Sequence, residues 1–112
     1  MNSNAKGKRG ERELAKELSF YGYSARRSQQ YCGANGDADL ITNLKYLHIE
    51  CKRVERLQLE DAMRQSLIDK KPEEIACVMH RKNNYPWLVT LTLRDFMSIY
   101  REFELNKMEE EK

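Results

Sequence analysis

Two stretches of this 112-residue chain decide its fold: Gly36-Asp37-Ala38-Asp39-Leu40-Ile41 and, eleven residues after Asp39, Ile49-Glu50-Cys51-Lys52. Each reads as a strand, and the turn between them is centred on Asn43-Leu44, so we expect a hairpin. Side chains alternate along a strand, which places Glu50 and Lys52 on the same face. The hairpin is therefore expected to bring Asp39, Glu50 and Lys52 together at one end of a sheet.

Two carboxylates and an amine in this arrangement suit the metal-assisted cleavage of a phosphodiester bond. Mg²⁺ binds one or two carboxylates together with waters and phosphate oxygens, and it activates a bound water near neutral pH. Asp39, Glu50 and the backbone carbonyl of Cys51 are the expected metal ligands. Lys52 is expected to orient or deprotonate the attacking water, or to offset charge on the phosphate.

Asp37 competes with Asp39, because two residues apart on a strand they face the same way. Asp39 is preferred, since the apolar Leu40-Ile41 that follows marks the start of a buried strand. Asp37 has the composition of a turn residue, in Asn35-Gly36-Asp37.

A further carboxylate comes from the first expected helix, over residues 8–21. Leu14 and Leu18 belong to its apolar stripe, and Glu11 lies on the same stripe, whereas Glu13 lies on the other side. We therefore expect Glu11 to point inward, as a metal ligand or through a metal-bound water.

Apolar periodicity and turn residues predict the other elements. Strands are expected at 23–28, 38–42, 45–53, 75–79 and 86–91, and helices at 8–21, 59–69 and from 93 onward. Lys71-Pro72 ends the second helix, and Thr92 with Asp95 resembles a capping box that opens the third. The apolar stripe of this third helix is Leu93, Phe96, Tyr100 and Phe103. The order α-β-β-β-α-β-β-α predicts an α/β fold with a mixed central sheet flanked by helices.

The composition is that of a single domain, residues 1–112, with flexible ends at 1–7 and 106–112. No apolar run approaches the roughly 18 residues of a membrane helix, and the polar start carries no secretory signal. We therefore expect no membrane contact and a cytoplasmic location. The three widely spaced cysteines are expected to be reduced thiols: Cys32, Cys51 and Cys77.

The net charge of +2 is unevenly distributed along the chain. Residues 1–30 carry seven basic and three acidic side chains, a net +4, whereas residues 102–112 carry five acidic and two basic ones, a net −3. An anionic partner is therefore expected to meet the N-terminal third. Charge alone does not distinguish DNA contact from a solvated surface.

The pattern Asp–x(10)–Glu-x-Lys with an upstream helical Glu resembles that of the PD-(D/E)xK nuclease superfamily. The opening Lys6-Gly7-Lys8-Arg9-Gly10-Glu11-Arg12-Glu13-Leu14 is similar to that of the archaeal-type Holliday junction resolvases and their phage-encoded relatives. Gly22-Tyr23-Ser24-Ala25-Arg26-Arg27-Ser28 continues the similarity, which covers residues 6–53 and the order of elements beyond. It implies a restriction-endonuclease-like fold.

The resemblance also implies a homodimer that cuts four-way DNA junctions symmetrically with Mg²⁺ or Mn²⁺, in the host cytoplasm if the chain is phage-encoded. Carried over by position, the catalytic set is Glu11, Asp39, Glu50 and Lys52. The residues expected at the DNA are Lys6, Lys8, Arg9, Arg12, Arg27, Ser28 and Arg53. Two departures from the family pattern stand out: Ala38 replaces a common Pro or Val, and the loop over 29–38 is longer.

Two alternatives stay open. One is a nuclease of the same superfamily that acts on flaps or plain duplex DNA, and the other is a non-catalytic DNA-binding or dimerisation module. The four intact site residues favour an enzyme, because a degenerate copy would be free to lose at least one. The last helix or the apolar edge near Trp87 could form the dimer surface, and Gln65 could reach the site from the second helix.

Overall fold

The computed structural model describes residues 3–27 and 40–112, with side chains from Arg9 onward. Over these residues the chain has a mixed α/β fold in the predicted order of elements. The helices are α1 (Ser3–Ser19), α2 (Leu59–Asp69) and α3 (Leu93–Glu110). The strands are β1 (Ala25–Arg27), β2 (Leu40–Thr42), β3 (Leu47–Arg53), β4 (Ile75–Arg81) and β5 (Leu88–Thr90). They form two small sheets, β1-β2 and β3-β4-β5.

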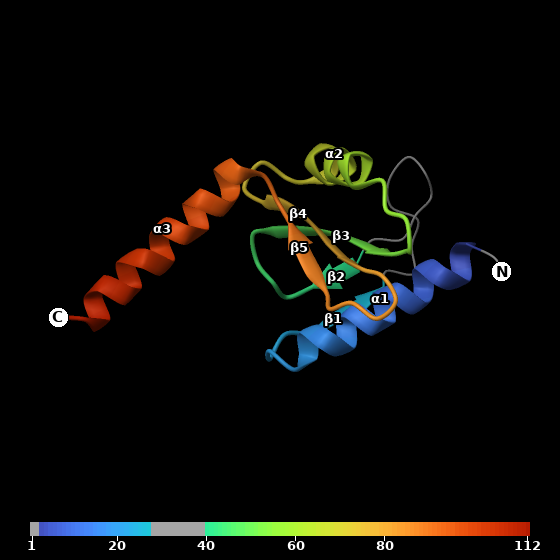
Figure 1. Ribbon diagram of the computed structural model, residues 1–112, viewed down its shortest axis with the longest axis horizontal. Coiled ribbons are helices and arrows are strands. Elements are labelled where there is room, and N and C mark those ends of the chain that lie inside the picture. Colours follow the sequence, from blue (N-terminus) through green and yellow to red (C-terminus); the bar gives the residue numbers. More distant parts are fainter. Residues whose placement is uncertain (1–2, 28–39) are drawn as a thin grey trace.

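The parallel pair β3-β4 lies between α1 and α2 (Figure 1). Ile49 is opposite Cys77 in this pair, and both belong to the core on the face that α1 covers. That core cluster consists of Leu14, Leu18, Ile49, Cys77 and Met79. The predicted apolar run of β4 is confirmed as an interior strand, since residues 76–79 are all buried.

Helix α2 has the predicted bounds and covers the other face of the sheet. Ser66 is fully buried there, and its hydroxyl donates a hydrogen bond to the carbonyl of Cys77 at 3.0 Å. The same hydroxyl lies 3.5 Å from the carbonyl of His48 on β3. A small polar side chain thus fixes α2 against both central strands.

The predicted pairing of a β2-β3 hairpin is wrong over the described residues. Strand β2 pairs antiparallel with β1 instead, with Ile41 opposite Arg26. Tyr46, just before β3, has φ of 67°, a left-handed conformation that an extended strand does not contain. The hydroxyl of Thr42 also accepts a hydrogen bond from the backbone of Leu44, which turns the chain before β3 begins. The two strands still contact each other.

The helix ends differ from the sequence expectation at both termini. Helix α1 begins at Ser3 instead of residue 8, and α3 continues through Glu110 instead of fraying after residue 105. Gly22, with φ of 88°, ends α1 as predicted, and Tyr23 donates a backbone hydrogen bond to Leu18. The cap at Thr92 is also confirmed, because its side chain accepts from the Asp95 N–H at 3.2 Å. Among the described residues, no helix has the length and apolar character needed to cross a membrane.

Gly10 sets how closely α1 approaches β3. It is buried, and a Cβ atom added to it would lie 2.6 Å from the Cβ of Arg53. No ordinary contact between carbon atoms is that short, so any larger residue would push α1 away from the strand.

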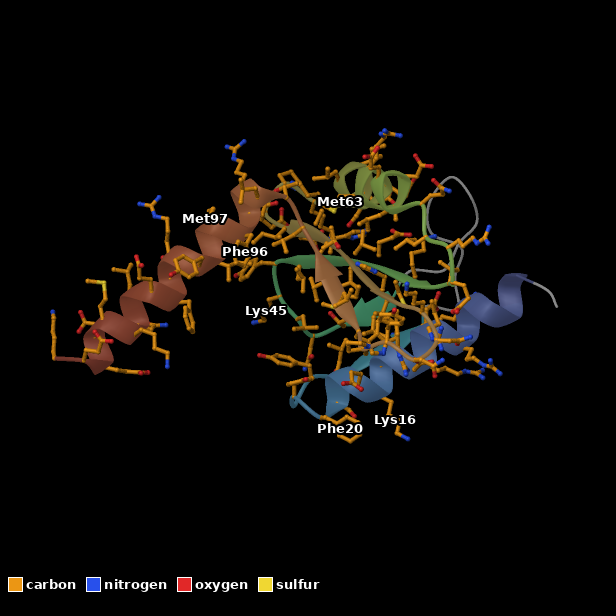
Figure 2. The ribbon with its side chains drawn as sticks, viewed as in Figure 1. Lys16, Phe20, Lys45, Met63, Phe96 and Met97 are labelled. Carbon is orange, nitrogen blue, oxygen red and sulfur yellow. The ribbon has the colours of Figure 1, made fainter. Side chains whose placement is uncertain are left out.

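We expect Gly10→Ala to lower the free energy of unfolding by about 1–3 kcal/mol, because the overlap has to be relieved by a backbone shift. Intrinsic propensity acts in the opposite direction, since Ala favours a helix by about 1 kcal/mol over Gly. Urea unfolding measures the net change in the free energy of unfolding. The control is Lys16→Ala on the exposed face of α1 (Figure 2), which is expected to change stability by less than about 0.5 kcal/mol. A Gly10→Ala protein at least as stable as the wild type would contradict the close approach.

Candidate functional site

Glu50 and Lys52 project from β3 on the face that α2 covers, because the alternate residues Ile49 and Cys51 pack toward α1. Their side chains are 21% and 39% exposed, and the Lys52 Nζ lies 3.9 Å from Glu50 Oε1. The shared face expected from the sequence is thus present. It places a carboxylate and an ammonium group side by side in a partly open position.

Glu11 is held on α1 as its place on the apolar stripe predicts. Its side chain is only 14% exposed, and its Oε2 lies 2.9 Å from Arg27 Nε on β1. Helix α1 contacts both β1 and β3, so this ion pair sits where the two sheets meet. Arg27, expected at DNA, balances the charge of Glu11 in this state.

The pKa of the Cys51 thiol reflects the charged groups around this segment of β3. Burial first, and then the negative charges of Glu11 and Glu50, raise its pKa to about 12, while the positive charge of Lys52 opposes them. Coulomb interactions of this kind weaken with distance. Glu11 from α1 and Glu50 from β3 therefore direct negative charge at the same segment of β3.

Some predicted site residues lie outside the described part of the chain: Asp37, Asp39, Ser28 and the side chains of Lys6 and Lys8. The described chain resumes at Leu40, next in sequence to Asp39, and the strand that starts there contacts β3. Of the other residues expected at DNA, Arg9 and Arg12 are exposed on α1.

Two further side chains that could bind a metal, not predicted from the sequence, lie close to Glu50. One ligand atom each from His48, Glu50 and Asp69 lies within 4.8 Å of the others. Asp69 comes from the last turn of α2, and the amide of Gln65 donates to its Oδ2 at 2.9 Å. Gln65 is thus connected to the site by its hydrogen bond to Asp69. Asp69 was missed because it is distant in sequence, although it continues the inward stripe of Ala62 and Ser66 at helical spacing.

This cluster can hold a divalent cation with one imidazole nitrogen and two carboxylates. Carboxylates suit Mg²⁺ and Mn²⁺, and an imidazole ligand shifts the preference from Mg²⁺ toward transition metals. Glu50 is therefore the common residue of two candidate ligand sets, one with Asp39 and Glu11 and one with His48 and Asp69.

We expect His48→Gln and Asp69→Asn each to weaken Mn²⁺ binding about tenfold or more, because each removes one ligand. Titration of Mn²⁺ followed by electron paramagnetic resonance measures this affinity. Glu60→Gln, an exposed carboxylate at the opposite end of α2, is the matched control and should leave it unchanged. An affinity insensitive to both ligand substitutions would exclude this cluster as a metal site.

Glu13 and Arg53 form a second polar group at the junction of α1 with the sheet. Arg53 Nε lies 3.2 Å from Glu13 Oε2, and Arg81 at the end of β4 also pairs with Glu13. Arg53 Nη2 further donates to Asn83 at 2.8 Å, and its side chain is only 17% exposed. Arg53, expected at DNA, is thus engaged within the protein. Glu13, expected on the outer side of its helix, bridges two arginines.

We expect Glu13→Gln to lower the free energy of unfolding by about 1–2 kcal/mol, because two partly buried guanidinium groups lose their counter-charge. Urea unfolding measures this change. Glu17→Gln, one turn further along α1, removes the same charge from a residue with no ion pair among the described residues. Equal effects of the two substitutions would show that the network contributes nothing specific.

Comparison with protein-family models, with curated proteins and with solved structures gave no match. The proposed function therefore rests on the residues of this chain and their geometry.

Proposed function

We propose that this protein is a divalent-metal-dependent endodeoxyribonuclease of the PD-(D/E)xK type, with a restriction-endonuclease-like fold. The observation that carries the proposal is the placement of Glu50 and Lys52 on one face of β3, with Glu11 directing its charge at the same strand segment. A mixed α/β fold with a central parallel strand pair between two helices supports it.

In this proposal Asp39, Glu50 and the carbonyl of Cys51 would hold Mg²⁺ or Mn²⁺, and Glu11 would join them directly or through a metal-bound water. The ion would supply Lewis-acid stabilisation of the phosphate and an activated water. Lys52, whose ammonium group pairs with Glu50, offsets negative charge that develops on the phosphate. Arg27 holds the carboxylate of Glu11 in place from β1.

The proposed substrate is DNA, and in particular a four-way junction cut by a homodimer. Support comes from the basic N-terminal third, where Arg9, Arg12 and Lys16 are exposed on one side of α1 at helical spacing. Such a stripe contacts phosphates without reading sequence, as a structure-specific enzyme requires. Flaps or plain duplex are the alternative substrates within the same class.

Purified protein with Mg²⁺, incubated with a synthetic junction, a flap and linear duplex, tests the proposal. We expect paired symmetric nicks in the junction and a loss of about 100-fold or more in rate for Lys52→Ala, because charge stabilisation is lost. Lys45→Ala is the matched control, since it removes an exposed lysine from the turn before β3 (Figure 2).

Glu50→Ala should abolish cleavage and leave junction binding intact, as measured by gel shift without metal. Equal cutting of all three substrates would show that the protein is a general nuclease and not a junction resolvase. Binding without cutting by the wild-type protein would overturn the proposal in favour of a non-catalytic module.

A further inference from the structure

His48, Glu50 and Asp69 form a cluster that joins β3 to the C-terminal end of α2. One ligand atom from each side chain lies within 4.8 Å of the other two. A tetrahedral ion with bonds of about 2.0–2.1 Å holds its ligand atoms about 3.4 Å apart, so only a small further approach is needed. Asp69 is exposed and can rotate toward the strand, where His48 and Glu50 are half-buried. The three side chains can therefore converge on one ion.

The C-terminal end of α2 concentrates negative charge at this cluster. Asp69 is the last residue of the helix, at the end where the helix dipole disfavours a carboxylate and favours a cation. Glu50 adds a second carboxylate from β3. Lys52 lies 3.9 Å from Glu50, too far for a hydrogen bond, and the Nζ of Lys70 is directed at the carbonyl of Lys71 at 3.4 Å. These lysines thus offset the charge only in part, and the cluster attracts a cation.

The ligand types select a transition metal over Mg²⁺. Mg²⁺ binds oxygen ligands and keeps several waters, whereas Zn²⁺ binds imidazole nitrogen together with carboxylate oxygen. Three protein ligands also leave a fourth position of the tetrahedron for water. Gln65 donates to Asp69 Oδ2 at 2.9 Å and so orients this carboxylate, as the outer hydrogen-bond partners of metal ligands do.

Glu50 belongs to two ligand sets that draw it in opposite directions along β3. His48 precedes it by two residues, whereas Cys51 and Lys52 follow it. A strand advances about 3.3 Å per residue, so His48 and Lys52 lie about 13 Å apart on either side of Glu50. An ion in the cluster therefore draws the Glu50 carboxylate toward the start of the strand and away from Cys51 and Lys52.

We propose that the His48–Glu50–Asp69 cluster binds Zn²⁺ or a similar transition-metal ion, and that this ion withdraws Glu50 from the proposed Mg²⁺ site. Each ion then lowers the affinity for the other by the same factor. The binding stands on the cluster alone, whereas its inhibition of DNA cleavage rests on the proposed function. The cluster is in this sense an inhibitory metal site.

Titration of the full-length protein with Co²⁺, without DNA or Mg²⁺, tests the binding. A site of nitrogen and oxygen ligands gives the visible absorption bands of Co²⁺ without the near-ultraviolet charge-transfer band of a thiolate ligand. Displacement of the bound Co²⁺ by Zn²⁺ gives the Zn²⁺ affinity. We expect His48→Gln and Asp69→Asn each to weaken the binding of both ions about tenfold or more, because each removes a ligand.

His80→Gln is the matched control, since it removes the other imidazole of the chain. His80 lies on β4, where its Nε2 is 2.9 Å from Thr90 Oγ1, and its loss should leave both affinities unchanged. Circular dichroism checks the folding of each variant. Binding that persists in both His48→Gln and Asp69→Asn would overturn the proposal, as would a charge-transfer band that assigns the ion to a cysteine.

Competition with Mg²⁺ tests the sharing of Glu50, again without DNA. We expect Mg²⁺ to weaken Zn²⁺ binding in the wild type and much less in Asp39→Asn, because Asp39 belongs to the proposed Mg²⁺ set alone. Equal weakening in the two proteins would mean that Mg²⁺ enters the cluster itself. A Zn²⁺ affinity that Mg²⁺ leaves unchanged or raises would also contradict the proposal, and a rise would indicate that Glu50 bridges two ions.

Cleavage in Mg²⁺ with a series of Zn²⁺ concentrations tests the consequence, each protein being compared with its own rate in Mg²⁺ alone. We expect the Zn²⁺ concentration for half-inhibition to rise about tenfold or more in His48→Gln. Equal inhibition of the wild type and His48→Gln would refute the inhibitory role. Zn²⁺ that binds and competes with Mg²⁺ in a protein that cuts no DNA would refute only the proposed function. An active nuclease whose Zn²⁺ binding ignores His48 and Asp69 would refute only this inference.

Discussion

The close approach of α1 to β3 is the constraint on which the other features depend. Gly10 has no Cβ, which allows the helix backbone to lie against Arg53. The next residue, Glu11, is thereby brought beside the strand that carries Glu50 and Lys52, and Leu14 one turn later fills the core. The absence of a side chain at Gly10 therefore links the packing of α1 to the position of Glu11 beside the strand of Glu50 and Lys52.

Much of the local structure was predictable, because it depends on signals within a few residues. The bounds of α2 follow from its stripe and from Lys71-Pro72, and the start of α3 follows from the cap at Thr92. The buried run of β4 was also recognisable, since an interior strand needs no polar alternation. In the site, the shared face of Glu50 and Lys52 follows from strand periodicity alone.

The features that were not predictable arise from contacts between distant segments. Asp69 lies near Glu50 because α2 packs against β3 and β4, where Ser66 donates a hydrogen bond to the carbonyl of Cys77. Glu13 lies off the apolar stripe, but two arginines from different strands converge on it. Over the described residues β2 pairs with β1 instead of β3, and Tyr46 before β3 has a left-handed backbone that no residue preference indicates, since glycine is the usual residue there.

Helix α3 (Leu93–Glu110) sets both how far its C-terminal end lies from the sheet and the side toward which that end faces. An α-helix advances about 1.5 Å and rotates by about 100° with each residue. Inserting a single residue into α3 would therefore change the distance to its far end only slightly, but it would turn that end to a different side. An insertion of seven residues nearly restores the rotation while adding about 10 Å. The direction in which the far end of α3 faces is thus more sensitive to a short insertion than its distance from the sheet.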